Sequence, residues 1–336
     1  MRKVFNLREI YNGMKEAEYW KKIGENVRCE LCPHFCFIKN GEIGKCGVRQ
    51  NQNGILFSLV YGKPCSMAID PIEKKPLYHF LPGNKTLSIA TNGCNFKCQH
   101  CQNLEISQGK VQGLEIQPKY VVKEAKKSKI ISYTYTEPTV FYEYMKDIAQ
   151  LAKRYKIKNV MVTNGFINHK PLKELLPFID AINIDVKGNP EFYEMICKGN
   201  LRPVLESIKI MQEHKIWIEL TYLIIPGLND SHLDIDRFVS WVEKNLGKNV
   251  PIHFTAFYPK YKMLHLPKTT QSKLETARKI GLAKGLNYVY NEINQNTSCP
   301  KCKEIVIKRA GFSVIENKLR KGKCFNCKEN IAGAWH

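Results

Sequence analysis

Several features that would restrict the function of this 336-residue chain are absent from its sequence. No run of about 18 uninterrupted apolar residues occurs, and a helix needs such a run to cross a bilayer. The amino-terminal segment lacks the apolar stretch and the small-residue cleavage site of a secretion signal. Internal repeats and low-complexity tracts are also missing. We therefore expect a protein that is soluble and cytoplasmic and that does not contact a membrane.

The amino-terminal segment 1–20 instead predicts an amphipathic helix. Apolar side chains recur along it at helical spacing, at Leu7, Ile10, Tyr11, Met14 and Ala17. We expect these side chains to form one face of that helix.

The composition is that of a globular protein with an excess of positive charge. Apolar residues make up 43% and charged residues 25%, so the chain can bury at least one full-sized core. The formal net charge is +21. A lysine-rich surface can follow nucleic-acid phosphates, but lysine and glutamate enrichment is also common in proteins from hot habitats. A solvated surface is the favoured interpretation, and a functional basic face is the alternative.

Cysteine is abundant, and its distribution indicates metal ligation. A chain of this length without an export signal has little use for disulfides. Two of the thirteen cysteines, Cys65 and Cys197, stand apart, and we interpret each as a small buried apolar residue. The others form three clusters, which are Cys29, Cys32, Cys36 and Cys46, then Cys94, Cys98 and Cys101, and finally Cys299, Cys302, Cys324 and Cys327.

The pattern of strands and helices divides the chain into three parts. Residues 1–78 contain the expected first helix and the first Cys cluster, and residues 294–336 contain the third. Between them, residues 79–293 alternate short apolar strands with amphipathic helices, of which 138–155 is the clearest. The strands we expect are Thr86–Thr91, Ile130–Tyr135, Asn159–Thr163, Ala181–Val186, Ile216–Ile225 and Ile252–Phe257, with a closing strand at Asn287–Tyr290.

This alternation predicts an α/β fold with a parallel sheet. Six βα units are too few for an eight-fold barrel, so we expect a partial (β/α)6 barrel or a doubly wound sheet. In either architecture, ligands gather at the carboxyl ends of the strands.

The second Cys cluster lies on a loop directly after the first of these strands. Cys94, Cys98 and Cys101 have the spacing C-x3-C-x2-C. Three thiolates on one short loop can bind three irons of a [4Fe–4S] cluster and leave the fourth iron without a protein ligand. An open iron can chelate the amino and carboxylate groups of a substrate. Zinc is the alternative, but a structural zinc site needs a fourth ligand, which His100 within the loop would have to supply.

This loop resembles that of the radical S-adenosylmethionine (SAM) superfamily, whose signature is C-x3-C-x-aromatic-C, with His100 at the aromatic position. The resemblance implies a [4Fe–4S] cluster on the three cysteines. It also implies that SAM is cleaved reductively to a 5′-deoxyadenosyl radical, which abstracts hydrogen from a substrate. A non-catalytic iron–sulfur or zinc scaffold is the rival interpretation, and it predicts a cluster closed by a fourth ligand.

Further matches lie at the ends of later strands. The segment 135–138 stands where the superfamily usually has Gly-Gly-Glu-Pro, which implies that Glu137 holds the ammonium of the bound methionine moiety. Glu137 can also begin the next helix, as an acid near its positive end. The segments 163–165 and 185–187 resemble motifs of glycyl-radical-enzyme activases such as pyruvate formate-lyase activating enzyme. They imply contacts to ribose or carboxylate from Asn164, Asp185 and Lys187.

The two flanking Cys clusters each offer four thiolates. Cys29, Cys32, Cys36 and Cys46 can surround either zinc or a second [4Fe–4S] cluster, and a buried thiol cluster without metal is the remaining alternative. The third cluster, at Cys299, Cys302, Cys324 and Cys327, consists of two C-x2-C knuckles, which is typical of a zinc ribbon. Zinc there would contribute on the order of 10 kcal/mol to the folding of a module too small for its own core.

The three blocks together resemble one family along nearly the whole chain, the radical SAM enzyme of the AmmeMemoRadiSam system. The matching stretches are 29–36, 44–49, 133–138, 256–263, 299–302 and 331–335. The family is named for occurring with Memo-like and AMMECR-like proteins, which are candidate partners beside an electron donor. The resemblance to the activases, and not this one, implies a protein or peptide substrate. RNA modification is the rival function, motivated by the net charge and the basic carboxyl-terminal module.

Overall fold

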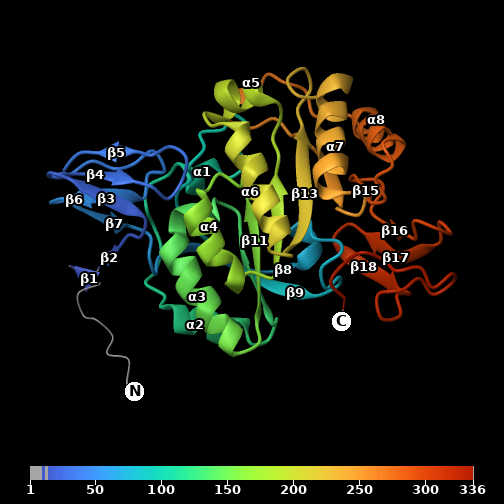
Figure 1. Ribbon diagram of the computed structural model, residues 1–336, viewed down its shortest axis with the longest axis horizontal. Coiled ribbons are helices and arrows are strands. Elements are labelled where there is room, and N and C mark those ends of the chain that lie inside the picture. The colour runs from blue at the N-terminus through green and yellow to red at the C-terminus, as the bar shows by residue number, and fades with distance from the viewer. Residues whose placement is uncertain (1–9, 12–13, 336) are drawn as a thin grey trace.

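The computed structural model describes residues 10–11 and 14–335. At its centre lies an eight-stranded sheet with the order β15-β14-β13-β12-β11-β10-β9-β8 (Figure 1). The strands from β9 to β15 are parallel and neighbour one another in chain order. Because this order never reverses, the sheet is that of a partial barrel and not of a doubly wound fold.

All of the expected strands are present, within two residues of the expected ends. The bounds of the parallel strands are β9 Lys85–Thr91, β10 Ile130–Tyr133, β11 Lys158–Thr163, β12 Ala181–Asp185, β13 Trp217–Ile224, β14 Ile252–Ala256 and β15 Val289–Tyr290. Most of their side chains are buried on both faces of the sheet, which explains why these strands are nearly continuous apolar runs in the sequence.

Helices cover the outer face of this sheet (Figure 1). The expected helix at 138–155 forms as the 3₁₀ turn η3 (Pro138–Phe141) and helix α3 (Tyr142–Arg154), with Pro138 at the first helical position. None of the helices in the described ranges is long and apolar enough to cross a membrane. The longer helices are α2 Pro118–Ala125, α3 Tyr142–Arg154, α4 His169–Leu175, α6 Leu201–Glu213, α7 His232–Leu246 and α8 Gln271–Ala283.

The expected amino-terminal helix is wrong where the structure describes this segment. Ile10–Tyr11 is strand β1 and Met14–Glu16 is strand β2, and Ala17 follows β2. Leu7 lies outside the described residues. β2 pairs with β7 (Ile55–Ser58), so backbone groups of this segment are satisfied by a distant strand. An isolated short helix is marginal in water, and the sheet edge offers the stronger set of hydrogen bonds.

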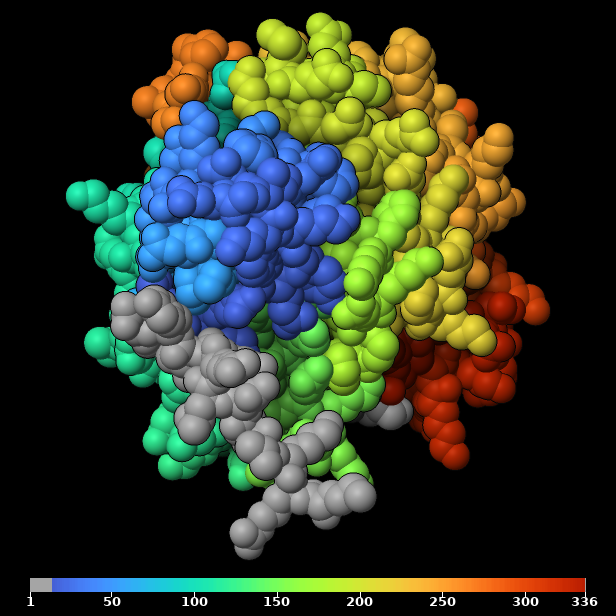
Figure 2. Space-filling view, turned by 60° about the vertical axis from the view of Figure 1, so that its left-hand side comes forward, coloured from blue at the N-terminus to red at the C-terminus, as the bar shows by residue number. Residues whose placement is uncertain are grey.

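Two small structures lie on opposite sides of the barrel (Figure 1). On one side, β6 (Arg49–Gln52) pairs with β7, and β3 (Trp20–Ile23), β4 (Asn26–Cys29) and β5 (Phe37–Ile38) form a second sheet. Figure 2 shows these strands seated as one mass against the barrel. On the other side lies the sheet of β16 Thr297–Ser298, β17 Ile305–Ala310 and β18 Ser313–Asn317.

Strand β8 (Pro64–Pro71) was not expected from the sequence. It pairs antiparallel with β9 and forms an edge of the central sheet. Its two terminal prolines and its mixed exposure hide it from a search for apolar runs. β8 places the Asp70 carboxylate within hydrogen-bond reach of the side chain of Tyr135, two residues beyond the end of β10.

Candidate cluster-binding site

A cavity of about 330 Å³ opens at the carboxyl ends of the parallel strands. It lies where the (β/α) architecture predicts a ligand site. The structure brings together at its walls all of the residues that the second Cys cluster and the later strand ends suggested, namely Cys94, Cys98, Cys101, Glu137, Asn164, Asp185 and Lys187.

The loop after β9 is held in place from two sides. The amide of Lys97 donates to the Cys197 carbonyl at 2.9 Å, and the amide of Gln99 donates to the Ile196 carbonyl at 3.1 Å. Phe96 is buried between neighbouring aromatic rings, and a Cβ on Gly199 would lie only 2.2 Å from its ring. Glycine at this position therefore permits the close packing that fixes the loop.

The spacing of the loop thiols fits an iron–sulfur cluster better than a single ion. Zinc holds its sulfurs at about 2.3 Å, which places them about 3.8 Å apart in a tetrahedron. In the described part of the chain, the sulfurs of Cys94, Cys98 and Cys101 do not all lie within 4.8 Å of one another. A cubane carries its thiolates on separate irons and accommodates this wider spacing.

The environment of these thiols disfavours their thiolate form. Burial and the nearby carboxylate of Glu137 raise the pKa of Cys94 well above its usual value. For Cys98, a hydrogen bond with the Cys197 thiol and burial both raise the pKa. Thiolates form here when a metal centre replaces the protons. Cys197 is fully buried, as expected, whereas Cys65 is only half-buried and its thiol donates to the Ala90 carbonyl.

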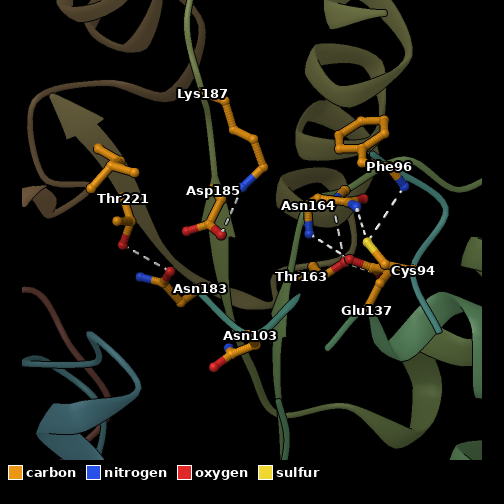
Figure 3. Close-up of polar contacts among 12 residues, drawn as sticks. Cys94, Phe96, Asn103, Glu137, Thr163, Asn164, Asn183, Asp185, Lys187 and Thr221 are labelled. Atoms are coloured by element: carbon orange, nitrogen blue, oxygen red, sulfur yellow. Dashed lines mark hydrogen bonds and ion pairs between the residues drawn. The ribbon is translucent and has the colours of Figure 1, made fainter. Parts of the chain in front are cut away.

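Glu137 is buried and connects the ends of β10 and β11 (Figure 3). Its Oε1 accepts from the Thr139 amide at 3.0 Å and from the hydroxyls of Thr139 and Thr163 at 2.7 Å each. Its Oε2 accepts from the Asn164 amide at 2.8 Å. Burial raises the pKa of Glu137, and these hydrogen bonds oppose that rise. Glu137 thus begins the η3 turn, and it also faces the cavity.

Asn164 connects the end of β11 to the cysteine loop. Its Nδ2 donates to Oδ1 of Asn95 at 2.8 Å and lies 3.9 Å from the Cys94 sulfur. Its Oδ1 accepts from the Phe166 amide at 2.9 Å. Both ends of the side-chain amide are therefore engaged with protein, and Asn164 holds the position of Cys94 (Figure 3).

Asp185 and Lys187 form an ion pair on the opposite wall, with 3.1 Å between Oδ2 and Nζ. Burial alone would lower the pKa of Lys187, but the Asp185 carboxylate and the thiols of Cys98 and Cys197 raise it well above its usual value. The Lys187 side chain therefore presents a stable positive charge to the cavity.

Comparison with known proteins decides the family. Residues 88–239 match the model of the radical SAM superfamily, and this interval contains the three loop cysteines and the four residues on the cavity walls. The chain is also 44% identical over 331 residues to an uncharacterized protein of Methanocaldococcus jannaschii, covering 95% of this chain and 99% of that protein. The chain belongs to the radical SAM superfamily.

Other similarities are more distant. A second M. jannaschii protein, named provisionally as a glycyl-radical enzyme activating enzyme, is 27% identical over 207 residues, or 58% of this chain and 76% of that protein. The crystal structure of a radical SAM methyltransferase from Sphaerobacter thermophilus aligns with a TM-score of 0.48 and 16% identity, over 64% of this chain and 69% of that one.

In this radical SAM site, Tyr135 is a residue whose role the sequence did not reveal. It stands at a position where the superfamily usually has glycine, and its φ of +65° explains that preference. Its hydroxyl donates to Asp70 of β8, and the Lys75 ammonium lies 4.3 Å from the centre of its ring. The departure from glycine was the visible signal, but Asp70 lies on a strand that the sequence did not predict, and Lys75 lies just beyond that strand.

The carboxyl-terminal cysteines form a separate site of different size. Cys299 and Cys327 lie 3.5 Å apart between sulfurs, and Cys302 and Cys324 lie 3.6 Å apart. All four sulfurs lie within 4.8 Å of one another. This spacing suits one tetrahedral ion, so these residues can bind a metal such as zinc.

Proposed function

We propose that this chain cleaves SAM reductively and takes a hydrogen atom from a protein or peptide substrate, as a glycyl-radical-enzyme activase does. The observation that carries the proposal is the grouping of Cys94, Cys98 and Cys101 on the wall of one cavity with charged groups facing them. The loop supplies three thiols, so one iron of a cluster remains free for a ligand.

The ligand chemistry of these residues suits the family cofactor. Cys94, Cys98 and Cys101 would hold a [4Fe–4S] cluster. When bound and reduced by an external one-electron donor, the cluster supplies the electron that splits SAM into methionine and a 5′-deoxyadenosyl radical.

The chain's own residues bind and orient SAM. Glu137 Oε2 accepts one hydrogen bond from protein and has a lone pair left for the ammonium of the methionine moiety. Lys187 carries the charge that pairs with the carboxylate, and Asp185 beside it can accept from ribose hydroxyls. Asn164 acts through the loop, because its amide is already bonded to Asn95.

Exposed apolar residues beside the loop support a peptide or protein substrate. Met195 is 58% exposed, and its carbonyl accepts from the Gln99 side chain. Tyr258 is 45% exposed, and its carbonyl accepts from the Gln102 side chain. These residues lie next to the cysteine loop and offer apolar contacts at the approach to the cavity. Memo-like and AMMECR-like proteins are the first substrates to test.

The test is anaerobic reconstitution with iron and sulfide, reduction, addition of SAM and quantification of 5′-deoxyadenosine. The wild type should form it, and a variant with Cys94, Cys98 and Cys101 changed to alanine should not. Cys65→Ala is the matched control and should behave as the wild type. If a reduced cluster is present and no 5′-deoxyadenosine forms, the scaffold interpretation replaces this one.

A second measurement addresses the substrate. Uniformly deuterated candidate protein should pass deuterium into 5′-deoxyadenosine, detected by mass spectrometry. If SAM is cleaved but the 5′-deoxyadenosine stays unlabelled with every candidate, the radical chemistry stands and those proteins are not its substrates.

A further inference from the structure

The first four cysteines converge on one enclosed pocket in the amino-terminal sheets. Cys29 ends β4, and its amide donates to the Cys36 carbonyl at 2.9 Å, which closes the turn that carries Cys32. Cys46 lies on the turn before β6. Leu31, Ile38 and Val140 supply apolar walls to the pocket that the four thiols line. Residues from two strands and two turns thus build a common site.

The four sulfurs of this pocket are arranged differently from those of the carboxyl-terminal site. Within the described residues, no three of Cys29, Cys32, Cys36 and Cys46 have sulfurs that all lie within 4.8 Å of one another. The carboxyl-terminal thiols satisfy that condition, and Cys94, Cys98 and Cys101 do not. The first four cysteines therefore do not form the compact arrangement of a one-ion site, and separate irons of a cluster suit them better than one tetrahedral ion.

A buried cation completes the pocket. Arg49 is only 2% exposed and lies on the pocket wall. Its Nη2 donates to the Glu18 carbonyl at 2.6 Å and to Oε1 of Glu143 at 2.7 Å. Its Nε and Nη1 are buried and have no hydrogen-bond partner. Unsatisfied buried N–H groups are costly, so their presence beside four sulfurs indicates an anionic group that accepts from them.

The pocket adjoins the loop of the proposed catalytic cluster. The Cys94 amide donates to the Cys46 carbonyl at 3.4 Å. Asn95 lines the pocket, and its carbonyl is bonded to His34 at 2.7 Å. A Cβ on Gly93 would lie 2.7 Å from Val48, and the φ of +104° also requires glycine there. The two cysteine-bearing segments are therefore in direct backbone contact.

We propose that Cys29, Cys32, Cys36 and Cys46 bind an auxiliary [4Fe–4S] cluster with four protein ligands, whose sulfurs accept hydrogen bonds from Arg49. Four thiolates leave no iron open, so this centre does not bind SAM. A cubane with four thiolates is an anion, which accounts for the buried guanidinium. The proposal goes beyond the proposed function and does not depend on SAM cleavage.

The decisive experiment uses the full chain with Cys94, Cys98 and Cys101 changed to alanine, purified and reconstituted anaerobically. We expect about four iron and four sulfide per chain, together with about one zinc at the carboxyl-terminal site. After reduction, its electron paramagnetic resonance spectrum should not change on addition of SAM. A chain with no iron and about two zinc ions, or with no metal at the first site, would overturn the proposal.

A second variant adds Cys32→Ala and Cys46→Ala to the first. It should lose the remaining iron while keeping its carboxyl-terminal zinc and a cooperative thermal transition, which shows that it folds. Iron that persists in this folded variant would place the cluster elsewhere and contradict the assignment.

Arg49 is tested in the background that lacks the loop cysteines. Arg49→Lys keeps a charge for Glu143 but removes the buried guanidinium N–H groups that have no protein partner. Because N–H donors to sulfur stabilise the reduced cluster, the variant should have a lower midpoint potential. Arg28→Lys, on the exposed face of β4, is the control and should leave the potential unchanged. Equal midpoint potentials in the two variants would show that Arg49 does not donate to the cluster.

Discussion

Glu137 illustrates at the residue scale how one side chain serves two roles. Four protein donors from two strand-end segments reach its carboxylate. The carboxylate accepts from the backbone amide of Asn164, and the side chain of Asn164 in turn contacts the Cys94 sulfur. The sequence suggested either a capping role or a SAM contact. The structure shows the cap, and the SAM contact stays a prediction.

Glu137→Gln tests the importance of this carboxylate. The glutamine amide has only one acceptor oxygen, and its NH₂ group would face donors that now bond to the carboxylate. Some of these buried N–H and O–H donors would therefore lose their acceptor. We expect a loss of about 1–3 kcal/mol in the free energy of unfolding and a decrease of about tenfold or more in 5′-deoxyadenosine formation. Urea unfolding and the cleavage assay measure the two effects. Glu194→Gln, at an exposed position, should change neither, and wild-type behaviour of Glu137→Gln would refute this role.

At the scale of elements, a hydrogen-bonded chain docks the carboxyl-terminal sheet onto the barrel. His79 Nδ1 lies 2.6 Å from the Ala332 carbonyl, so Nδ1 carries the proton and donates. Its Nε2 then accepts from the Tyr290 hydroxyl at 2.5 Å, and that hydroxyl also contacts Thr297. This arrangement requires a neutral imidazole, and burial lowers the pKa of His79 to about 4.

The contact between the carboxyl-terminal sheet and the barrel should therefore weaken in acid. In the unfolded chain His79 takes up a proton near pH 6.5, whereas in the folded chain it does so only near pH 4. Stability from this group is present above pH 6.5 and is lost as the pH falls from there towards 4. The expected loss between pH 7 and pH 5 is about 2 kcal/mol.

Urea unfolding at the two pH values measures this effect, with variants to isolate it from other titrating groups. His79→Asn should remove about that much of the pH dependence, and His214→Asn, at an exposed position, should remove none. The same pH dependence in the wild type and in His79→Asn would show that His79 is not responsible.

The carboxyl-terminal sheet should also depend on its metal. Its small apolar cluster includes the buried thiols Cys299 and Cys324, so the apolar packing of the module depends on the same residues that would bind the metal. We expect about one zinc per chain and loss of that zinc in Cys324→Ser. The variant should be cleaved rapidly by protease beyond residue 294, because structural zinc contributes on the order of 10 kcal/mol. Cys65→Ser is the control, and a protease-resistant, zinc-free Cys324→Ser would contradict a structural metal.

On the scale of the whole molecule, the two ends of the barrel have different surroundings. The carboxyl-terminal segment packs near the amino ends of the strands, where Ala334 pairs with Phe80 and contacts an apolar cluster that includes Ile130 and Ala181. The cavity opens at the carboxyl ends. The basic carboxyl-terminal module is therefore remote from the cavity, which favours a structural role over delivery of a nucleic acid.

This arrangement gives a prediction about the net charge of +21. We expect the purified protein to carry no RNA at about 200 mM salt and to bind a mixed RNA pool only weakly at about 50 mM. Filter binding across this range of salt measures the affinity for RNA. The ultraviolet absorbance ratio of the purified protein measures the RNA that it carries. RNA that remains bound and is released steeply with salt would favour the RNA-modifying alternative over a protein substrate.

The sequence by itself determined what depends on neighbours along the chain. Buried parallel strands are continuous apolar runs, so β9 to β14 were visible as local patterns, and the spacing of Cys94, Cys98 and Cys101 sets the chemistry of one short loop. The strand ends that carry Glu137, Asn164 and Lys187 meet in one cavity because parallel strands end at one edge.

Only the tertiary structure decided the features that depend on distant partners. The segment at β1 and β2 is strand and not helix because β7 supplies its hydrogen bonds, and β8 exists because β9 pairs with it. The sequence likewise contains two sets of four cysteines, and each set offers the same number of metal ligands. Their sulfur spacing differs because it is set by the packing of separate strands and turns, and it distinguishes a one-ion site from a wider one.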